Sequence, residues 1–524
     1  MFVRRKANKT GSVSVQVVDK SHGRYRVIKS LGAGRTEAEV VRLEEKARQH
    51  VRELTGTNRS LFEDEDEIKL EDFLSTISNS QIQVIGPEII FGTLYDRIGY
   101  GRIHNELFRH LVITRLFNPG SKLKTIDYLF RYQGVVYNIS KIYRFLDNLC
   151  FRREAVESQP DGIPDIKKQV EDISYSHMLR VLGGKIDVVF YDMTTLYFES
   201  SDEDDLRKTG FSKDGKHQCP QIFLGLLVGQ GGNPIGYELF EGNIFEGNTF
   251  IPVLQRMEER YNLGKPVVIA DSGLLSKKNI LALEENGYEY ILGARPKNEN
   301  DLIKQKILAF DLKDGDVRTI KKTGATRLVL SRTNKRMSKD AHNRKRGLDR
   351  LTKRLNSGKL TKSNINNKGY NKYLKMEGIV TISIDLEKFN ADAAWDGIKG
   401  YLTNTALQAK QVIANYRNLW FIERAFRMNK TDLRVRPIYH RLYNRIEAHI
   451  CICFTAYTVM LELERLLKAK KSVISLKRAQ EITHNMYQIL YQLPYSKDTK
   501  ARMLRMDSEQ QELYDIIIQS KTVN

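Results

Sequence analysis

The chain has few cysteines for its 524 residues, and their spacing does not suit cross-links or metal binding. The four are Cys150, Cys219, Cys451 and Cys453. They form no C-x-x-C pair and no disulfide framework, which favours reduced thiols in a cytosol. His217 with Cys219 and His449 with Cys453 could in principle contact zinc, but no complementary pair lies at zinc-finger spacing. We therefore expect neither disulfides nor structural zinc.

Long apolar runs are also missing. The start, Met1 to Lys6, is basic but lacks the apolar core of a signal peptide. The longest near-apolar run, Ile450 to Leu461, is too short to span a bilayer. It predicts a buried helix, and we expect no membrane segment.

Acidic residues are fewer than basic residues. Lys and Arg number 85 against 64 Asp and Glu, a net charge of +21, while 41% hydrophobic and 28% charged residues are typical of a soluble globular protein. The length suits two to four domains. An excess of this size favours a polyanionic partner, most often nucleic acid. A membrane-surface or ribosome-adjacent protein is the alternative.

Two segments share a pattern, a short apolar strand that ends in an aspartate. Val188 to Tyr191 precede Asp192, and Val267 to Ala270 precede Asp271. Such runs are typical of strands buried on both faces, and residues at their ends lie at the rim of an α/β sheet. One aspartate after a strand is usually only a turn residue. Two of them favour a shared site in which both carboxylates bind one cation.

The elements around these strands predict an α/β fold. Strands are expected at 221–228 and 234–240, on either side of a hairpin turn at 230–233. A helix to about Tyr261, the Asp271 strand, a helix over 277–286 and a strand over 288–293 follow. The order β-β-β-α-β-α-β, with a meander first, is that of a ribonuclease-H-like (retroviral-integrase-like) core.

Composition and periodicity divide the chain into seven segments. They are a small α+β unit at 1–57, an acidic linker at 58–80, a helical DNA-binding region at 81–182, the first part of the core at 183–296, a basic β-containing insertion at 297–410, the last part of the core at 411–460 and a C-terminal helical region at 461–524. In the first unit, a hairpin precedes a helix that Thr36 and Glu39 begin with a capping box. The region 81–182 is equally compatible with a plain helical packing domain.

The insertion carries a large excess of positive charge. From Arg332 to Lys375 there are fifteen Lys or Arg residues and only two acids. A basic run is usually a solvated face, but this excess favours a surface that follows DNA phosphates. Arg344, Lys345 and Arg346 are the candidate contacts.

A third acid lies on a helix predicted over Gln411 to Lys430. At helical spacing one mostly apolar face contains Tyr416, Leu419, Glu423, Phe426, Arg427 and Lys430. An acid on such a face indicates function. The alternative is an amphipathic helix with a Glu423–Arg427 surface pair, worth about 0.3 kcal/mol.

This helix resembles the YREK signature of bacterial insertion-sequence transposases of the DDE type, Tyr-x2-Arg-x3-Glu-x6-Lys. Tyr416, Glu423 and Lys430 match it in register, and Leu419 stands at the position of its Arg. Five further runs are similar to one subgroup of the insertion sequence 4 superfamily, related to insertion sequence 1634: Asp192–Thr195, Glu241–Asn243, Asp271–Gly273, Arg436–His440 and Arg445–Ile450.

The resemblance implies a transposase that cleaves DNA at the element ends and joins it to new DNA, as in cut-and-paste transposition. It implies two Mg²⁺ (or Mn²⁺) ions held by Asp192, Asp271 and Glu423, and contacts of Tyr416 and Lys430 with DNA phosphates. Arg427, one turn after Glu423, is expected to supply the charge that Leu419 lacks.

The expected partners are double-stranded DNA, as terminal inverted repeats and target, and a second copy of the chain in a synaptic homodimer. The expected location is the bacterial cytoplasm, at the nucleoid. Two other functions stay open: a ribonuclease-H-like nuclease without strand transfer, and a catalytically inactive DNA-binding repressor.

Three residues are candidates with a simpler alternative. Some superfamily members flip a base onto a tryptophan in the insertion, and Trp395 is the only Trp in the insertion of this chain. His440 and His449 are candidates for lining the site. Core packing is the alternative for each.

Overall fold

The computed structural model describes residues 1–21, 23–55, 65–75, 77–150, 165–210, 215, 218–358, 360–366, 369–377, 381–492 and 498–519. They form two compact units, Met1–Gln81 and Ile82–Asn524, which are described separately. Several predictions fall partly outside the described residues: 58–64 of the acidic linker, 151–164 of the helical region, His217, and Lys359 and Lys368 of the basic run.

The N-terminal unit is a three-stranded antiparallel sheet with one helix against it. Its elements are β1 (Phe2–Ala7), β2 (Val13–Asp19), β3 (Arg26–Gly34) and α1 (Glu37–Thr55). Its core includes Val15, Val17, Val40 and Ala47. The capping box is confirmed, because Thr36 Oγ1 accepts from Glu39 N and the Glu39 carboxylate accepts from Thr36 N. Strand β1 was not predicted, and α2 (Glu65–Ser75) lies inside the segment predicted as a linker.

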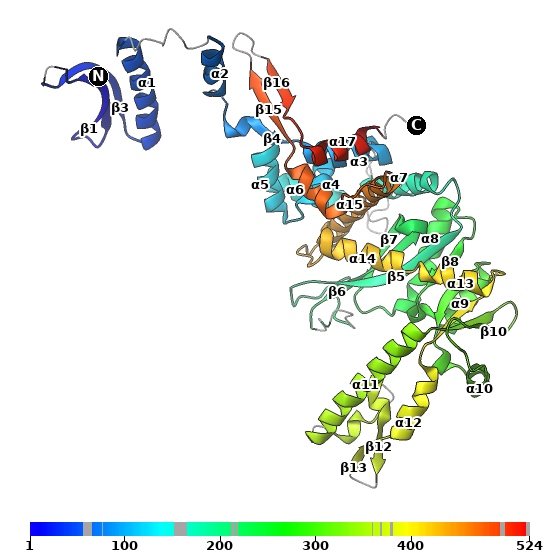
Figure 1. Cartoon of the computed structure of the whole chain (residues 1–524). Helices are drawn as coiled ribbons and strands as arrows, with labels where there is room; N and C mark the ends of the chain where they lie inside the picture. Colours follow the sequence, from blue (N-terminus) through cyan, green and yellow to red (C-terminus); the bar gives the residue numbers. More distant parts are fainter. Residues whose placement is uncertain are drawn as a thin grey trace. The chain divides into compact units, whose positions relative to one another are not determined.

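The second unit is organised around an eight-stranded sheet in the order β10-β11-β14-β9-β8-β5-β6-β7 (Figure 1). Its central strands are β5 (Val188–Tyr197), β6 (Gln221–Gly229), β7 (Pro234–Glu241), β8 (Val267–Ala270) and β9 (Tyr290–Ala294). The first three form an antiparallel meander, and β8 and β9 run parallel to β5. Helix α8 (Phe250–Tyr261) leads into β8, and α9 (Lys277–Glu285) connects β8 to β9. The α/β class is confirmed, and the strand order is that of a ribonuclease-H-like core.

The insertion adds three strands to this same sheet. Beyond β9 lie β14 (Ile398–Thr403), β11 (Arg327–Arg332) and β10 (Val317–Lys321), each antiparallel to its neighbour. Between β9 and β14 the chain also forms α10 (Asp301–Ala309), α11 (Asn334–Asn356), β12 (Leu374–Glu377), β13 (Thr381–Ile384) and α12 (Leu386–Ala391). The last four make up what we call the insertion lobe, which has its own small core and projects from the sheet in Figure 1.

Helices cover both faces of the central sheet. Those after the insertion are α13 (Ala409–Arg417), α14 (Trp420–Arg427) and α15 (Tyr443–Ala469). On β5, Tyr191 and Met193 pack with α8 and α9. Phe190 and Leu196 pack with α14 and α15 on the other face. Since side chains alternate along a strand, Asp192 points to the α14 face together with Phe190.

The remaining helices pack around α15. They are α3 (Thr93–Ile98), α4 (Glu106–Phe117), α5 (Lys122–Gln133), α6 (Ile139–Asn148), α7 (Ile166–Val181), α16 (Leu476–His484) and α17 (Ser508–Gln519). A small antiparallel sheet joins β4 (Ile82–Val84), β15 (Tyr487–Gln492) and β16 (Thr499–Met503). The C-terminal region therefore contains strands that were not predicted, because β15 is completed by a partner from the other end of this unit. Helix α15 also runs through the predicted boundary at residue 460.

Helix α15 is the one helix among the described residues that is long and apolar enough to cross a membrane. Its most apolar stretch is entirely buried inside the protein. Helices α3, α4, α6 and α7 contact it. An all-round apolar helix with such neighbours is a core helix, as the run from Ile450 to Leu461 predicted.

A buried carboxylate joins three of these helices. Glu462 on α15 accepts hydrogen bonds from Arg465, has His177 Nε2 of α7 at 3.3 Å and has Arg97 of α3 at 3.5 Å. Burial alone would raise the pKa of Glu462, but the hydrogen bonds from Arg465 and His177 lower it to about 2.

We predict that Glu462→Gln lowers the free energy of unfolding at pH 7 by about 3 kcal/mol, because the substitution leaves Arg97, whose side chain is only 16% exposed, without its counter-charge. The depressed pKa means that the charged carboxylate stabilises the fold above its unfolded pKa of about 4.3, and that this contribution is lost as the pH falls toward 2. Urea unfolding should therefore show a smaller difference between wild type and variant at pH 3 than at pH 7. An equal difference at both pH values would contradict this role.

Candidate active site

Asp192 and Asp271 follow paired positions on neighbouring parallel strands. β5 and β8 pair with Tyr191 opposite Ala270, and each aspartate is the next residue. Tyr191 and Ala270 belong to the core on the α8 side, so the alternation of side chains turns both carboxylates toward α13 and α14. Strand β5 continues past Asp192 to Tyr197. Asp192 thus lies where the pairing with β8 ends, rather than at the end of its strand as expected.

Tyr416 on α13 connects the helix layer to Asp271. Asp271 Oδ1 accepts from Ser272 N at 2.6 Å and from the Tyr416 hydroxyl at 3.3 Å. Burial, then the charge of Asp271 and the hydrogen bond to it, raises the pKa of Tyr416, and Asp192 contributes in the same direction. The phenol is therefore a protonated donor. Tyr416 is only 5% exposed, and its hydroxyl donates to Asp271. The phosphate contact that the resemblance implies stays a prediction.

Gly293 on β9 makes room for this hydrogen bond. A Cβ placed at residue 293 would overlap the Tyr416 hydroxyl and lie 2.9 Å from Ser272 N. The strand therefore needs a glycine where another side chain approaches its backbone closely.

Glu423 lies on α14, and the prediction of one helix over 411–430 is wrong. Backbone hydrogen bonds of the i to i+3 type run through Asn418 and Leu419 and separate α13 from α14. This break changes the helical phase. Leu419 is buried, whereas Glu423 and Arg427 are both exposed. The acid is thus open to solvent instead of lying on a buried face.

A cavity of about 810 Å³ lies beside Asp271, between the core and the insertion. Its lining includes Asp271 and Tyr416 from the core, and Arg336, Trp395 and Lys399 from the insertion. Burial and the charge of Arg336 lower the pKa of Lys399, while Asp271 and Glu423 act in the opposite direction. Asp271 and Lys399 both line the cavity, whereas Glu423 is not among its described lining residues.

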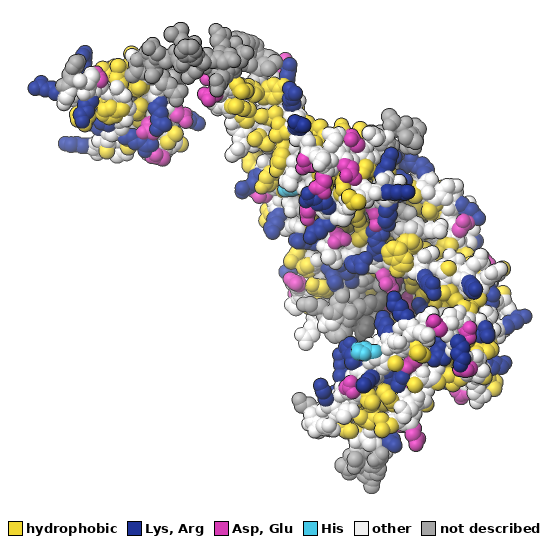
Figure 2. Space-filling view, viewed as in Figure 1, with side chains coloured by type: hydrophobic (Ala, Val, Ile, Leu, Met, Phe, Trp, Pro, Cys, Tyr) yellow, Lys and Arg dark blue, Asp and Glu magenta, His cyan; other side chains and the backbone are white. Residues whose placement is uncertain are grey.

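The basic residues of α11 differ in their surroundings. Arg344 forms an ion pair with Asp396, its side chain only 15% exposed, and its guanidinium lies 4.8 Å from the Phe389 ring centroid. It therefore holds α11 to the segment before β14. Lys345 and Arg346 are exposed. Lys and Arg side chains are visible over α11 and the adjoining core in Figure 2.

Trp395 is half-buried and packs against the small apolar cluster of Ile307, Leu328 and Leu330. It also lines the cavity beside Asp271. The residue thus has a packing role, and one side of it borders the candidate site.

The remaining candidates lie after α14. Lys430 is half-buried in a π-helical turn that continues α14 over Met428–Asp432. His449 Nε2 lies 3.0 Å from the Val435 carbonyl and its ring is 5.7 Å from that of His440. Burial lowers the pKa of His440 to about 4 and that of His449 well below its usual range. Both histidines contact core groups, as the core-packing alternative predicted.

A divalent cation suits the chemistry of the acids, whose donors are all carboxylate oxygens. Asp192 Oδ1 accepts from Met193 N at 2.8 Å, and Asp271 is bonded as described above. Within the described residues, no group of three His, Cys, Asp or Glu side chains is arranged to hold a metal ion. Strand register brings the two aspartates to neighbouring positions, and Glu423 lies on a helix of the layer that they face.

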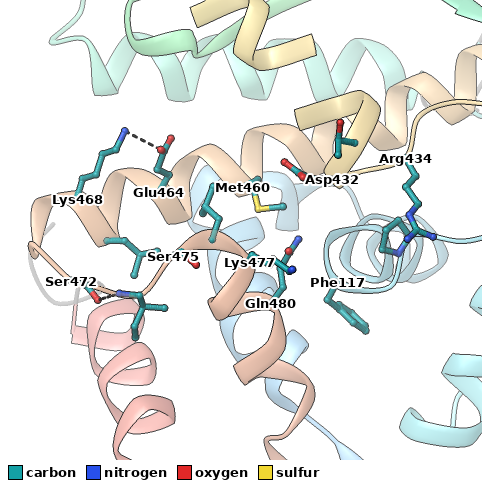
Figure 3. Close-up of a pocket in the computed structure, with 15 residues that line it drawn as sticks. Phe117, Asp432, Arg434, Met460, Glu464, Lys468, Ser472, Ser475, Lys477 and Gln480 are labelled. Carbon is teal, nitrogen blue, oxygen red and sulfur yellow. Dashed lines mark hydrogen bonds and ion pairs between the residues drawn. The ribbon is translucent and has the colours of Figure 1, made fainter. Parts of the chain in front are cut away.

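A second cavity, of about 630 Å³, lies between α15, α16 and the segment after α14 (Figure 3). Glu464 in its wall pairs with Lys468 at 2.9 Å and with Arg424. Met460, Phe117 and Gln480 supply much of the rest of the wall. Asp192, Asp271 and Glu423 do not line it, so it is separate from the acids.

The sequence alone did not single out Lys399 or Gly293. Lys399 lies among many basic residues of the insertion, and only the pairing of β14 with β9 brings it to the acids. Gly293 ends the predicted strand 288–293 and looks like an ordinary terminator. A glycine inside an apolar strand was the available signal, since it often marks a close approach.

Comparison with known proteins agrees with this geometry. The family model described as "Transposase DDE domain" matches residues 183–459, and the chain belongs to that family. No curated protein matches it. The chain is similar to the piggyBac transposase in a synaptic complex with hairpin DNA, with 11% identity, 76% of each chain covered and a TM-score of 0.40.

It is also similar to the Mos1 transposase in a paired-end complex with the left transposon end, with 13% identity and a TM-score of 0.15. That match covers 35% of this chain and 56% of the Mos1 chain. Likenesses of this degree add nothing to the family assignment, which places the chain among DNA transposases.

We predict that Gly293→Ala lowers the free energy of unfolding by about 1–3 kcal/mol, because the new methyl group meets Tyr416 and the backbone of Ser272. The matched control is Gly273→Ala, where the Cβ meets only the end of the Glu246 side chain at 3.3 Å. Thermal and urea unfolding of both variants provide the measurement. An equal loss in the two variants would contradict close packing at residue 293.

Proposed function

We propose that the protein is a transposase that cleaves DNA at the ends of an insertion sequence and joins the 3′ ends to target DNA. One observation carries the proposal: Asp192 and Asp271, adjacent on two parallel strands of a ribonuclease-H-like sheet, face the helix layer that bears Glu423. The chain also belongs to the transposase DDE domain family. The proposal includes the insertion sequence 4 superfamily, the YREK-type signature and the subgroup related to insertion sequence 1634.

Asp192, Asp271 and Glu423 would hold two Mg²⁺ or Mn²⁺ ions. Bound there, the ions would activate the attacking oxygen and stabilise the leaving oxygen of an in-line displacement at phosphorus. The support is the donor chemistry and the strand register, which places Asp192 and Asp271 at neighbouring positions on the sheet face covered by the helix layer that bears Glu423.

The protein's own groups orient the reaction. Tyr416 is a positioning residue, because its hydroxyl donates to Asp271 and thereby restricts the rotation of that carboxylate. Glu423 faces solvent, where a DNA duplex can approach it. Lys345, Arg346, Arg427 and Lys430 are proposed to bind phosphates of the backbone.

Trp395 lines the cavity beside Asp271, where it is proposed to stack on a nucleotide base. At about 810 Å³ the cavity has the volume of a small-molecule site. One nucleotide taken out of the duplex would stack on Trp395 in this cavity. A homodimer in a synaptic complex would hold both element ends, in the bacterial cytoplasm at the nucleoid.

We predict that the full-length protein nicks a labelled duplex carrying its own element end when Mg²⁺ or Mn²⁺ is present. Asp192→Asn, Asp271→Asn and Glu423→Gln should each slow cleavage on the order of 10³-fold, because each removes a charge needed at the reacting phosphate. DNA binding, measured by fluorescence anisotropy, should persist in all three.

The matched control is Asp301→Asn, whose side chain is 90% exposed on α10 and pairs with Lys304. It should cleave as wild type does. Cleavage without joining to target DNA would indicate the nuclease alternative. Binding without cleavage by the wild type would overturn the enzymatic proposal and leave a DNA-binding repressor.

We predict a second effect for the basic helix α11. Lys345→Gln together with Arg346→Gln should reduce the slope of log affinity against log salt by about 2, one for each lost phosphate contact. Arg344→Gln should instead lower stability by about 3 kcal/mol, because it leaves Asp396 buried without its partner. Salt titrations of DNA binding and urea unfolding measure the two effects.

Lys306→Gln, an exposed lysine of α10, is the control for loss of charge alone. If Lys306→Gln changes the salt slope as much per charge as the α11 variant, DNA binding does not depend on α11 in particular.

A further inference from the structure

Lys399 lies at the point where the insertion rejoins the core sheet. It is on β14, opposite Ser331 of β11, and the next residue, Gly400, pairs with Ala294 of β9. The strand is held on both sides by regular pairing, so the position of its backbone is determined by the sheet. A lysine of the insertion is thereby placed one strand away from β8, which leads into Asp271.

Two tyrosine rings position the ammonium. Lys399 Nζ lies 4.4 Å from the ring centroid of Tyr416 and 5.5 Å from that of Tyr401. The two rings are themselves 5.0 Å apart in an edge-on arrangement. A cation over an aromatic face is attracted to the ring, and a side chain held in this way loses less entropy when it binds a ligand.

The ammonium has no ion-pair partner among the described residues, although it is half-buried. The carboxylates that act on it are Asp271 and Glu423, and the cations that oppose them are Arg336 and Arg417. The same side chain lines the cavity that contains Asp271 and Tyr416. It therefore presents a positive charge, with unused hydrogen-bond donors, to the space beside the acids.

We infer that Lys399 binds a non-bridging oxygen of the DNA phosphate that enters beside Asp271. This inference rests on the proposed transposase function and adds a residue outside the signature helix. A lysine ammonium is a compact point charge with three donors and binds phosphate oxygens readily. Tyr416 then has two effects from one position: its hydroxyl orients Asp271, and its ring face orients Lys399.

The test is phosphate-by-phosphate substitution in the DNA. Duplexes carrying the element end, each with one neutral methylphosphonate near the cleavage site, are bound to full-length wild type and to Lys399→Gln in EDTA, where no cleavage occurs. Wild type should lose affinity at each contacted phosphate, including a loss of roughly 10- to 100-fold at the one position that Lys399 contacts. Lys399→Gln should bind unmodified DNA more weakly than wild type by a similar factor. A methylphosphonate at the position that Lys399 contacts should not weaken the binding of this variant further.

Three variants separate this contact from packing. Lys399→Arg should restore most of the affinity and the sensitivity, because it keeps the charge. Lys399→Met keeps an apolar stem over the Tyr416 ring, and it should behave like Lys399→Gln. Lys410→Gln, which removes an exposed lysine on the adjacent helix α13, should retain the wild-type pattern.

Two outcomes overturn the inference. The first is a Lys399→Gln or Lys399→Met protein that stays as sensitive as wild type at every position. The second is a Lys399→Met protein with wild-type affinity, which would show that the side chain only packs on the tyrosines. Failure of the proposed function gives a different result from failure of this inference. In that case the wild-type protein binds this DNA but does not cleave it when Mg²⁺ or Mn²⁺ is present.

Discussion

The parallel pairing of β5 with β8 is the constraint on which the rest of the site depends. Strand pairing places Tyr191 opposite Ala270 and so brings the following residues, Asp192 and Asp271, to neighbouring positions. A shift of one residue in either strand would turn its aspartate to the opposite face, toward α8 and α9. The register is held by apolar residues on both faces of these strands, and the core of the protein therefore specifies the position of two carboxylates.

The insertion and the helix layer both contribute residues to the site that contains these two aspartates. Strand β14 extends the same sheet and carries Lys399, while α13 carries Tyr416. The hydroxyl of Tyr416 and its ring face point to different partners, Asp271 and Lys399. Gly293 leaves the space that Tyr416 occupies. The long insertion is thus part of the site's wall, in addition to the lobe with the basic helix α11.

Much of this could be predicted from local patterns because each aspartate follows a short apolar run that is typical of a buried strand, although β5 continues past Asp192. Strand order followed from a meander and two later strands, and the buried helix α15 followed from its apolar run. The single helix over 411–430 was predicted wrongly, because periodicity does not detect a tight turn at Asn418 and Leu419 that changes the helical phase. The ion pair of Arg344 with Asp396 was equally hidden, because a basic run gives no indication of which charge has a partner far along the chain.

The sequence by itself determined the α/β class, the two aspartates that follow short apolar runs, the positive charge and the similarity of the signature helix to DDE transposases. These properties are local or additive, so composition, spacing and motif are sufficient to read them. Only the tertiary structure decided that Tyr416 serves Asp271, that Glu423 is exposed and that Lys399 lies beside the acids. Each of these depends on contacts between strands and helices distant in the chain, whose geometry is set by packing of the whole sheet and its two helix layers.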